Sequence, residues 1–135
     1  MKKIGYILLL IISITTITGC GCEKKKEEKK LEDVKVNTNK EVIKDQTLEV
    51  FTFTKTSLVY EDNMSYLTTL VKNTSNEKQY LQEFTIHVKD KEGNDIVALP
   101  GYVGDYLEAG EEKYITRSYK SDLTSAANIE YEIKR

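Results

Sequence analysis

The 135-residue chain has no tryptophan, one proline, one histidine (His87) and two cysteines (Cys20 and Cys22). Zinc sites usually need three or four ligands drawn from cysteine, histidine and carboxylates, and a hydrolytic triad needs a histidine beside a serine and a carboxylate. Alternation places His87 on the outer face of a strand, and nothing marks a serine as its partner. We therefore expect no catalytic residue, no metal ligand and no cofactor, and a protein that is not an enzyme.

An excess of positive charge is also absent. Lysine and arginine number 20 against 22 aspartate and glutamate residues, which gives a formal net charge of −2. Domains that bind nucleic acids carry a strongly basic surface, so we expect no nucleic-acid partner. Hydrophobic residues make up 39% of the chain, which is enough for a folded core.

The longest apolar run lies at the N-terminus. Lys2 and Lys3 precede it, and Ile4 to Ile14 is interrupted only by Gly5 and Ser13 before small polar residues follow. A positive start, an apolar middle and small residues at the end are typical of a secretory signal peptide. A transmembrane helix needs roughly 20 apolar residues, so this shorter run predicts export rather than a permanent membrane span.

The residues that end this run, Ile17-Thr18-Gly19-Cys20, resemble the lipobox of bacterial lipoproteins, although leucine is the usual residue at the Ile17 position. The resemblance implies cleavage between Gly19 and Cys20 and a lipid attached to the Cys20 sulfur. Each buried methylene of such a lipid contributes about 0.8 kcal/mol, so two or three acyl chains form a stable anchor. We expect the membrane to be a partner through Cys20, with the protein on the extracytoplasmic face of the cell membrane. A conventional signal peptide with an incidental cysteine is the alternative.

The sequence predicts three segments. Residues 1–19 form the signal peptide, residues 20–45 the lipidated cysteine and a charged flexible linker, and residues 46–135 one domain. Glu23 to Lys30 contains no apolar residue, which indicates a solvated spacer. An electrostatic contact with anionic lipid head groups is the alternative for these lysines. The rest of the linker is polar, with room for a short edge strand or a helical turn.

From Gln46 onward, short strands are predicted at a regular spacing. Leu48 to Phe53 is predicted as a strand with a bulge, Phe84 to Val88 alternates apolar with polar residues, and Pro100-Gly101 is predicted to end a strand that begins at Ile96. The absence of a convincing helical pattern indicates an all-β fold. We predict a small antiparallel β-sandwich.

Three short motifs resemble those of bacterial FxLYD-type, immunoglobulin-like domains. They are Val71-Lys72-Asn73-Thr74-Ser75, the turn Asp90-Lys91-Glu92-Gly93, and Leu107-Glu108-Ala109-Gly110-Glu111, which has alanine where proline is usual. The full FxLYD string is missing, because His87 and Val88 stand where leucine and tyrosine are expected. The resemblance implies an immunoglobulin-like β-sandwich. It does not imply a function, since one fold serves many functions.

Two groups of residues are candidates for binding. Tyr102 and Tyr106 flank Gly104 in the longest expected loop, and tyrosines in loops form contact surfaces in many binding proteins. The alternative is that they cover an edge of the core. Asp90 to Asp95 supplies several oxygen ligands that calcium would accept, but the spacing is not that of an EF-hand and indicates a hairpin turn.

These features favour a non-enzymatic binding or interaction module at the cell envelope, with a protein or an envelope polymer as its partner. One alternative is a protective or structural surface lipoprotein without a defined ligand. The other is an enzyme whose site is not recognisable from the sequence.

Overall fold

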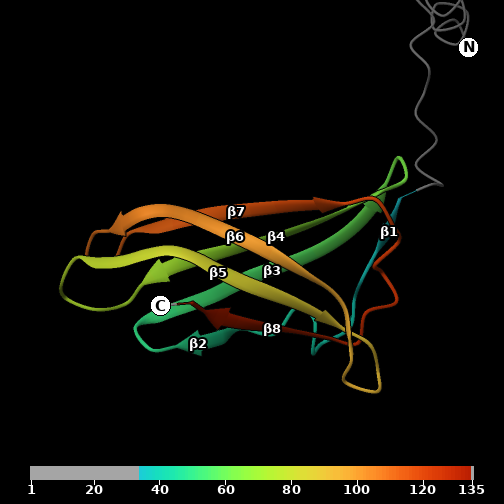
Figure 1. Cartoon of the computed structure of the whole chain (residues 1–135), viewed down its shortest axis with the longest axis horizontal. Coiled ribbons are helices and arrows are strands. Elements are labelled where there is room, and N and C mark those ends of the chain that lie inside the picture. Colours follow the sequence, from blue (N-terminus) through green and yellow to red (C-terminus); the bar gives the residue numbers. More distant parts are fainter. Residues whose placement is uncertain (1–33, 135) are drawn as a thin grey trace, which may run out of the picture. The chain divides into compact units, whose positions relative to one another are not determined.

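The structure is a computed structural model that describes residues 34–134, and within that range the chain is all-β, as the sequence predicted. No helix occurs among these residues, and every strand pair is antiparallel. The strands are β1 (Lys35–Val36), β2 (Gln46–Leu48), β3 (Phe51–Glu61), β4 (Met64–Asn73), β5 (Gln79–Lys89), β6 (Asp95–Leu107), β7 (Glu112–Tyr119) and β8 (Asn128–Ile133) (Figure 1).

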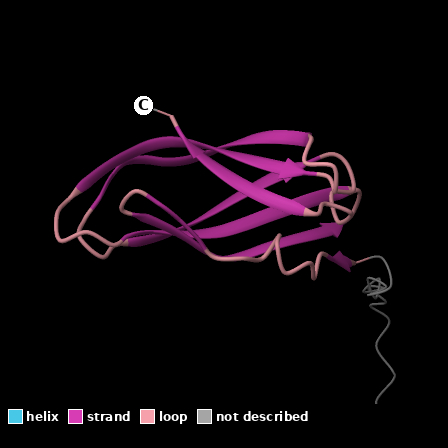
Figure 2. Cartoon of the chain, turned by 90° about the horizontal axis from the view of Figure 1, so that it is seen from below, coloured by secondary structure: helices cyan, strands magenta, loops and turns pink. Residues whose placement is uncertain are grey.

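The strands form two stacked sheets, which Figure 2 shows as two layers. The first sheet has the order β1-β3-β4-β7, with β2 pairing beside β1 along the same edge of β3. The second sheet has the order β6-β5-β8. The two sheets also meet at their edges, where β6 contacts β7 and β2 contacts β8. The result is a small antiparallel β-sandwich, whose strand order could not be read from the sequence.

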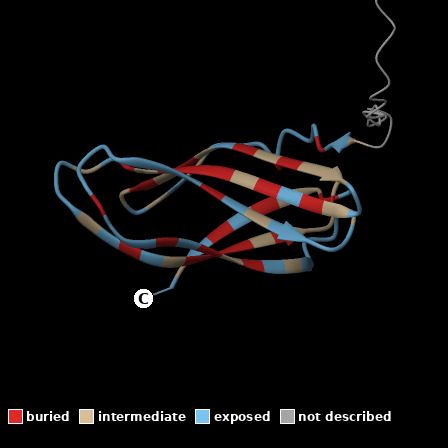
Figure 3. Cartoon of the chain, turned by 90° about the horizontal axis from the view of Figure 1, so that it is seen from above, coloured by how far each residue is buried: buried red, intermediate tan, exposed pale blue. Residues whose placement is uncertain are grey.

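The core lies between the sheets and consists of the alternate, inward-facing residues of each strand. Figure 3 shows this as buried bands separated by exposed ones along the strands. Phe53, Phe84 and Tyr131 form an aromatic cluster at its centre. The Phe53 ring stacks on Tyr131 with centroids 4.2 Å apart and meets Phe84 edge-on at 5.0 Å. Such a core can hold the domain together without a disulfide.

The segment predicted as one bulged strand from Leu48 to Phe53 is instead a hairpin. β2 ends at Leu48, β3 begins at Phe51, and these two residues pair across the turn formed by Glu49 and Val50. Glu49 takes a positive φ of 56°, which the turn requires. The slip in alternation that indicated a bulge therefore marks a change of strand.

The sandwich begins before Gln46, so the predicted linker boundary at residue 45 is too late. Val42 is completely buried in the core, and the Asn37 side chain donates hydrogen bonds to the carbonyl oxygens of Thr124 at 3.0 Å and Ala126 at 2.8 Å. Apolar residues are scattered in this segment without helical or strand periodicity. Its burial therefore depends on contacts that only the folded chain makes.

Asn73 joins two turns at one end of the sandwich and is completely buried. Its Nδ2 donates to the carbonyl oxygens of Glu77 at 2.7 Å, Leu107 at 3.0 Å and Glu108 at 3.1 Å. Its Oδ1 accepts from the backbone N–H of Ser75 at 2.9 Å and from the Ser75 hydroxyl at 2.8 Å. Two of the three short motifs found in the sequence thus lie side by side and share this hydrogen-bonded asparagine.

Candidate functional site

Tyr102 and Tyr106 lie on strand β6 and not in a loop, so the predicted binding loop is a strand surface. The sequence indicated a loop because Pro100 and Gly101 were expected to end the strand. β6 is the edge of the second sheet, and an edge strand tolerates proline because one side of its backbone has no ladder partner. The strand therefore continues to Leu107, and the connecting turn is confined to residues 108–111.

Tyr80, Tyr102 and Tyr106 are each about half exposed, and we call them the tyrosine surface. The pairing of β5 with β6 places Tyr80 directly opposite Tyr106. Their rings meet edge-to-face, with centroids 5.2 Å apart and an interplanar angle of 68°. This is a favourable aromatic geometry, so the two rings support each other while remaining open to solvent.

Two cations lie over the rings of the tyrosine surface. The Lys78 Nζ is 4.9 Å from the Tyr106 centroid, and the Arg117 guanidinium carbon is 5.8 Å from the Tyr102 centroid. Both distances are within the range of about 6 Å over which a cation is attracted to a ring face. Because Arg117 comes from β7, the tyrosine surface extends across the edge between the two sheets.

The two cations have different surroundings. Lys78 also contacts Glu108 at 3.1 Å, and this hydrogen bond raises the pKa of the Lys78 ammonium group. The Nε of Arg117 is buried and makes no hydrogen bond with any residue in the range 34–134. The tyrosine surface thus combines exposed aromatic rings with two cations, of which Lys78 is also paired with Glu108.

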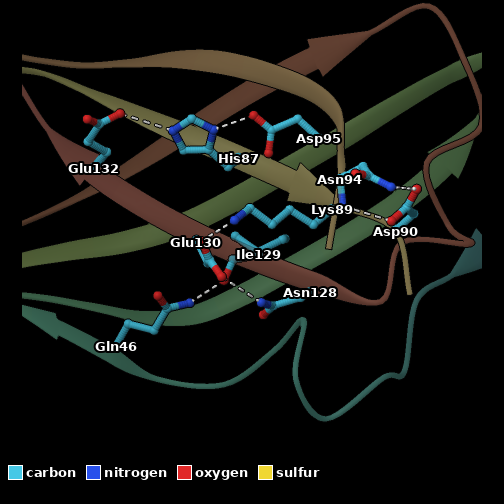
Figure 4. A network of polar contacts seen from close by, with 10 residues as sticks. All are labelled: Gln46, His87, Lys89, Asp90, Asn94, Asp95, Asn128, Ile129, Glu130 and Glu132. Atoms are coloured by element: carbon cyan, nitrogen blue, oxygen red, sulfur yellow. Dashed lines mark hydrogen bonds and ion pairs between the residues drawn. The ribbon is translucent and has the colours of Figure 1, made fainter. Parts of the chain in front are cut away.

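His87 lies on the outer face of the second sheet, as its alternation predicted, and connects three strands there (Figure 4). Its Nδ1 is 2.7 Å from Asp95 Oδ2 on β6, and its Nε2 is 3.2 Å from Glu132 Oε2 on β8. The hydrogen bond with Asp95 is the main reason that the pKa of His87 is raised, against the opposing effect of partial burial. Both ring nitrogens face a carboxylate, so His87 joins β5 to its two neighbours, β6 and β8.

The same face carries further polar contacts that tie the strands together (Figure 4). Lys89 on β5 forms an ion pair with Glu130 on β8, and the pKa of Lys89 is raised mainly by its hydrogen bond to Glu130. The Gln46 side chain on β2 donates to the Ile129 carbonyl oxygen at 2.5 Å and so links the two sheets. These contacts join β8 to β5 and to β2, so they have a structural role.

The oxygen-rich turn after β5 is a hairpin turn, as the sequence indicated. Asp90 Oδ1 accepts the backbone N–H groups of Glu92 and Asn94, each at 2.9 Å. The bond from Asn94 is the main reason that the pKa of Asp90 is lowered. Within residues 34–134, no group of three or more histidine, cysteine, aspartate or glutamate side chains could hold a metal ion.

Gly19 and Cys20, where cleavage and lipid attachment are predicted, lie outside the described residues, as does the charged segment that follows them. Over the described range 34–134, no helix has the length and apolar character needed to cross a membrane.

Sequence reasoning missed Tyr80, Lys78 and Arg117. Period-two alternation counted back from Phe84 places Tyr80 on the inner face. The structure reverses this, because the pairing of β5 with β6 shifts register between Leu81 and Glu83. Arg117 meets Tyr102 only because β6 and β7 belong to different sheets that touch at their edges. No local pattern could have indicated the outward position of Tyr80 or the contact of Arg117 with Tyr102.

Comparison with known proteins gives no relatives: no family model, no curated protein and no solved structure matches this chain.

Proposed function

We propose that the chain is the precursor of a bacterial lipoprotein, anchored through Cys20 on the extracytoplasmic face of the cell membrane. In this proposal the β-sandwich is a non-enzymatic binding module with an FxLYD-like, immunoglobulin-like character. The tyrosine surface is its contact site for a protein or an envelope polymer. The anchor follows from the resemblance of Ile17-Thr18-Gly19-Cys20 to a lipobox.

The observation that carries the binding proposal is the grouping of three half-exposed tyrosines with two cations over their rings. Tyrosine and arginine are enriched among the residues that dominate binding energy at protein interfaces. Tyrosine also presents a large contact area at a low cost in side-chain entropy. A surface that already holds its rings by edge-to-face and cation contacts loses little further freedom on binding.

The test is crosslinking of a tagged chain in its native host, followed by mass spectrometry of the captured species. We expect one dominant partner. Replacing both Tyr102 and Tyr106 with alanine should reduce its yield at least about tenfold, since one hot-spot tyrosine contributes about 2 kcal/mol or more. Tyr114→Ala is the matched control, because Tyr114 is similarly exposed but lies on β7, away from the ring contacts of the tyrosine surface.

A companion variant, Cys20→Ser, tests the anchor. It should release the chain from the membrane fraction, whereas the tyrosine variants should stay there. Equal loss of the partner in Tyr114→Ala and in the double variant would contradict the assigned site. If the wild-type chain is found in the membrane fraction and captures no partner, a protective or structural role is the better account.

A further inference from the structure

The guanidinium group of Arg117 is the part of the tyrosine surface whose bonding capacity the described chain leaves unused. Within residues 34–134, Arg117 forms no ion pair with a carboxylate, and its buried Nε has no hydrogen-bond acceptor. Its guanidinium carbon instead lies 5.8 Å from the centroid of the Tyr102 ring. The residue as a whole is only partly buried, so a partner can approach the guanidinium from solvent.

The lysines of the described residues differ from Arg117 in their surroundings. Six of them pair with a carboxylate: Lys35, Lys44, Lys78, Lys89, Lys91 and Lys134. An exposed lysine without such a pair is readily solvated, because its ammonium group is compact and strongly hydrated. A guanidinium is planar and more weakly hydrated, so it suits a carboxylate better. Arg117 and Arg135 are the two arginines among 20 basic residues, so arginine at this position departs from the chain's use of lysine.

The Tyr102 ring holds this guanidinium in place before a partner binds. A planar guanidinium can donate two parallel hydrogen bonds to one carboxylate, and charged bonds of this kind are roughly twice as strong as neutral ones. Contact with a ring face favours a limited range of orientations, so Arg117 loses less freedom on binding than a fully solvated side chain. Tyr102 is itself half exposed, so a partner that reaches Arg117 also covers this ring.

The charges around the tyrosines favour a single anionic group over a string of them. Glu83 lies directly opposite Tyr102 in the pairing of β5 with β6. Asp105 immediately precedes Tyr106 in the chain. A polymer with a negative charge on every unit would place charges beside these carboxylates, and like charges brought together oppose binding. A protein segment with one acidic residue among uncharged ones meets Arg117 without that cost.

We propose that the tyrosine surface recognises a protein partner through one carboxylate, which accepts two hydrogen bonds from Arg117 while uncharged residues of the partner cover the tyrosine rings. This assignment rests on the binding function proposed above and narrows the partner to a protein with an acidic residue at the contact. Arg117 selects the partner by charge, whereas Tyr102 and Tyr106 supply contact area.

The test uses a water-soluble carbodiimide on membranes of the native host that contain the tagged full chain. The carbodiimide activates a carboxylate, and a primary amine in direct contact then displaces it as a urea and forms an amide. Arg117→Lys supplies a primary amine at this position, whereas the guanidinium of the wild type does not react. We expect the new lysine to be joined to an aspartate or glutamate of the partner, which mass spectrometry of the crosslinked peptides identifies.

A second variant measures how much the charge contributes. Arg117→Gln should reduce the yield of the captured partner by about ten- to a hundredfold, because it removes hydrogen bonds between charged groups. The matched control is Lys120→Gln, which removes the same charge from an exposed position just after β7 and should change the yield by less than about twofold. Amide formation in Arg117→Lys requires a folded site, so it separates recognition from misfolding of Arg117→Gln.

An amide with a carboxylate of a partner protein, absent when Tyr102 and Tyr106 are also replaced with alanine, would support the proposal. An amide with a carboxylate of the chain itself, a phosphoramidate with a polymer, or no product at this position would overturn it. Loss of the partner in the tyrosine double variant with an unchanged yield in Arg117→Gln overturns the role of Arg117 and leaves the proposed function standing. An unchanged yield in the tyrosine double variant overturns both.

Discussion

Asn73 illustrates at the residue scale how a short sequence motif acquires a structural meaning. The sequence shows an asparagine in a polar turn, which is an ordinary place for this residue. In the fold the side chain is completely buried, and it supplies a donor to the backbone of a second turn more than thirty residues away. The two motifs are therefore connected by one amide group.

We expect Asn73→Ala to lower the free energy of unfolding by about 2–4 kcal/mol, because buried carbonyl groups that lose a donor cost about 1–3 kcal/mol each. Urea unfolding of a chain that begins at Cys20 measures the change. The matched control is Asn76→Ala, since Asn76 lies in the same turn but is exposed, and its replacement should stay within about 0.5 kcal/mol. Similar effects of the two substitutions would argue against the assigned role of Asn73.

Strand β6 shows at the element scale why glycine and proline were misleading here. The sequence predicted that Pro100-Gly101 ends a strand, yet both residues lie inside β6. Gly101 is needed for space and not for a turn. A Cβ atom at this position would lie 2.4 Å from the Phe84 ring that packs over it. Only the pairing of β5 with β6 brings that ring to Gly101, so the sequence alone could not reveal the reason for the glycine.

His87 is expected to make the stability of the second sheet depend on pH. Neutral imidazole has one N–H donor, so it can donate to Asp95 or to Glu132 but not to both, whereas the protonated ring donates to both. Because the pKa of His87 is raised in the folded chain, its stabilising contribution is fully present below its ordinary value of about 6.5. The contribution is lost as the pH rises through the pKa of the folded state.

We therefore expect the difference in unfolding free energy between the wild type and His87→Gln to decrease as the pH is raised from 5 to 9. Carboxylates have their ordinary pKa values below this range, so their ionisation should not obscure the trend. Urea unfolding at several pH values measures the difference. His87 is the one histidine in the sequence, so the pH titration of its NMR signal gives its pKa independently. A constant difference across this range would contradict the two-carboxylate contact.

At the scale of the whole molecule, the start of the domain shows the difference between what a sequence pattern can predict and what only tertiary packing determines. Val42 and Ile43 are neighbours in a polar segment, and the sequence offers no reason to distinguish them. The folded chain buries Val42 completely and leaves Ile43 substantially exposed. Lys35 also contacts Asp122 at 2.7 Å, which holds β1 to the loop before β8 and lowers the pKa of Asp122 to about 2.

We expect Val42→Ala to lower the free energy of unfolding by about 2 kcal/mol, through lost burial of two methyl groups and the cavity left behind. Ile43→Ala, the adjacent control, should change it by less than about 0.5 kcal/mol. Urea unfolding of the same chain that begins at Cys20 gives both values. If neither substitution has an effect, residues 34–45 behave as the linker that the sequence suggested.

The proposed binding site was only partly predictable. Tyr102 and Tyr106 could be singled out because exposed tyrosines near glycine are often contact residues, and both are indeed half exposed. The residues around these two tyrosines could not be predicted. A register shift in β5 turns Tyr80 outward, and the contact between sheet edges brings Arg117 over Tyr102.

The sequence by itself determined that the described chain is all-β and that it forms a small antiparallel sandwich, because period-two alternation and turn residues are local properties. It also carries the N-terminal pattern on which the proposed lipid anchor rests. The tertiary structure decided the strand order, the early start of the domain, the course of β6 through Pro100, and the grouping of tyrosines with cations. These features depend on contacts between residues far apart in the chain, and a local pattern does not encode which edges and faces will meet.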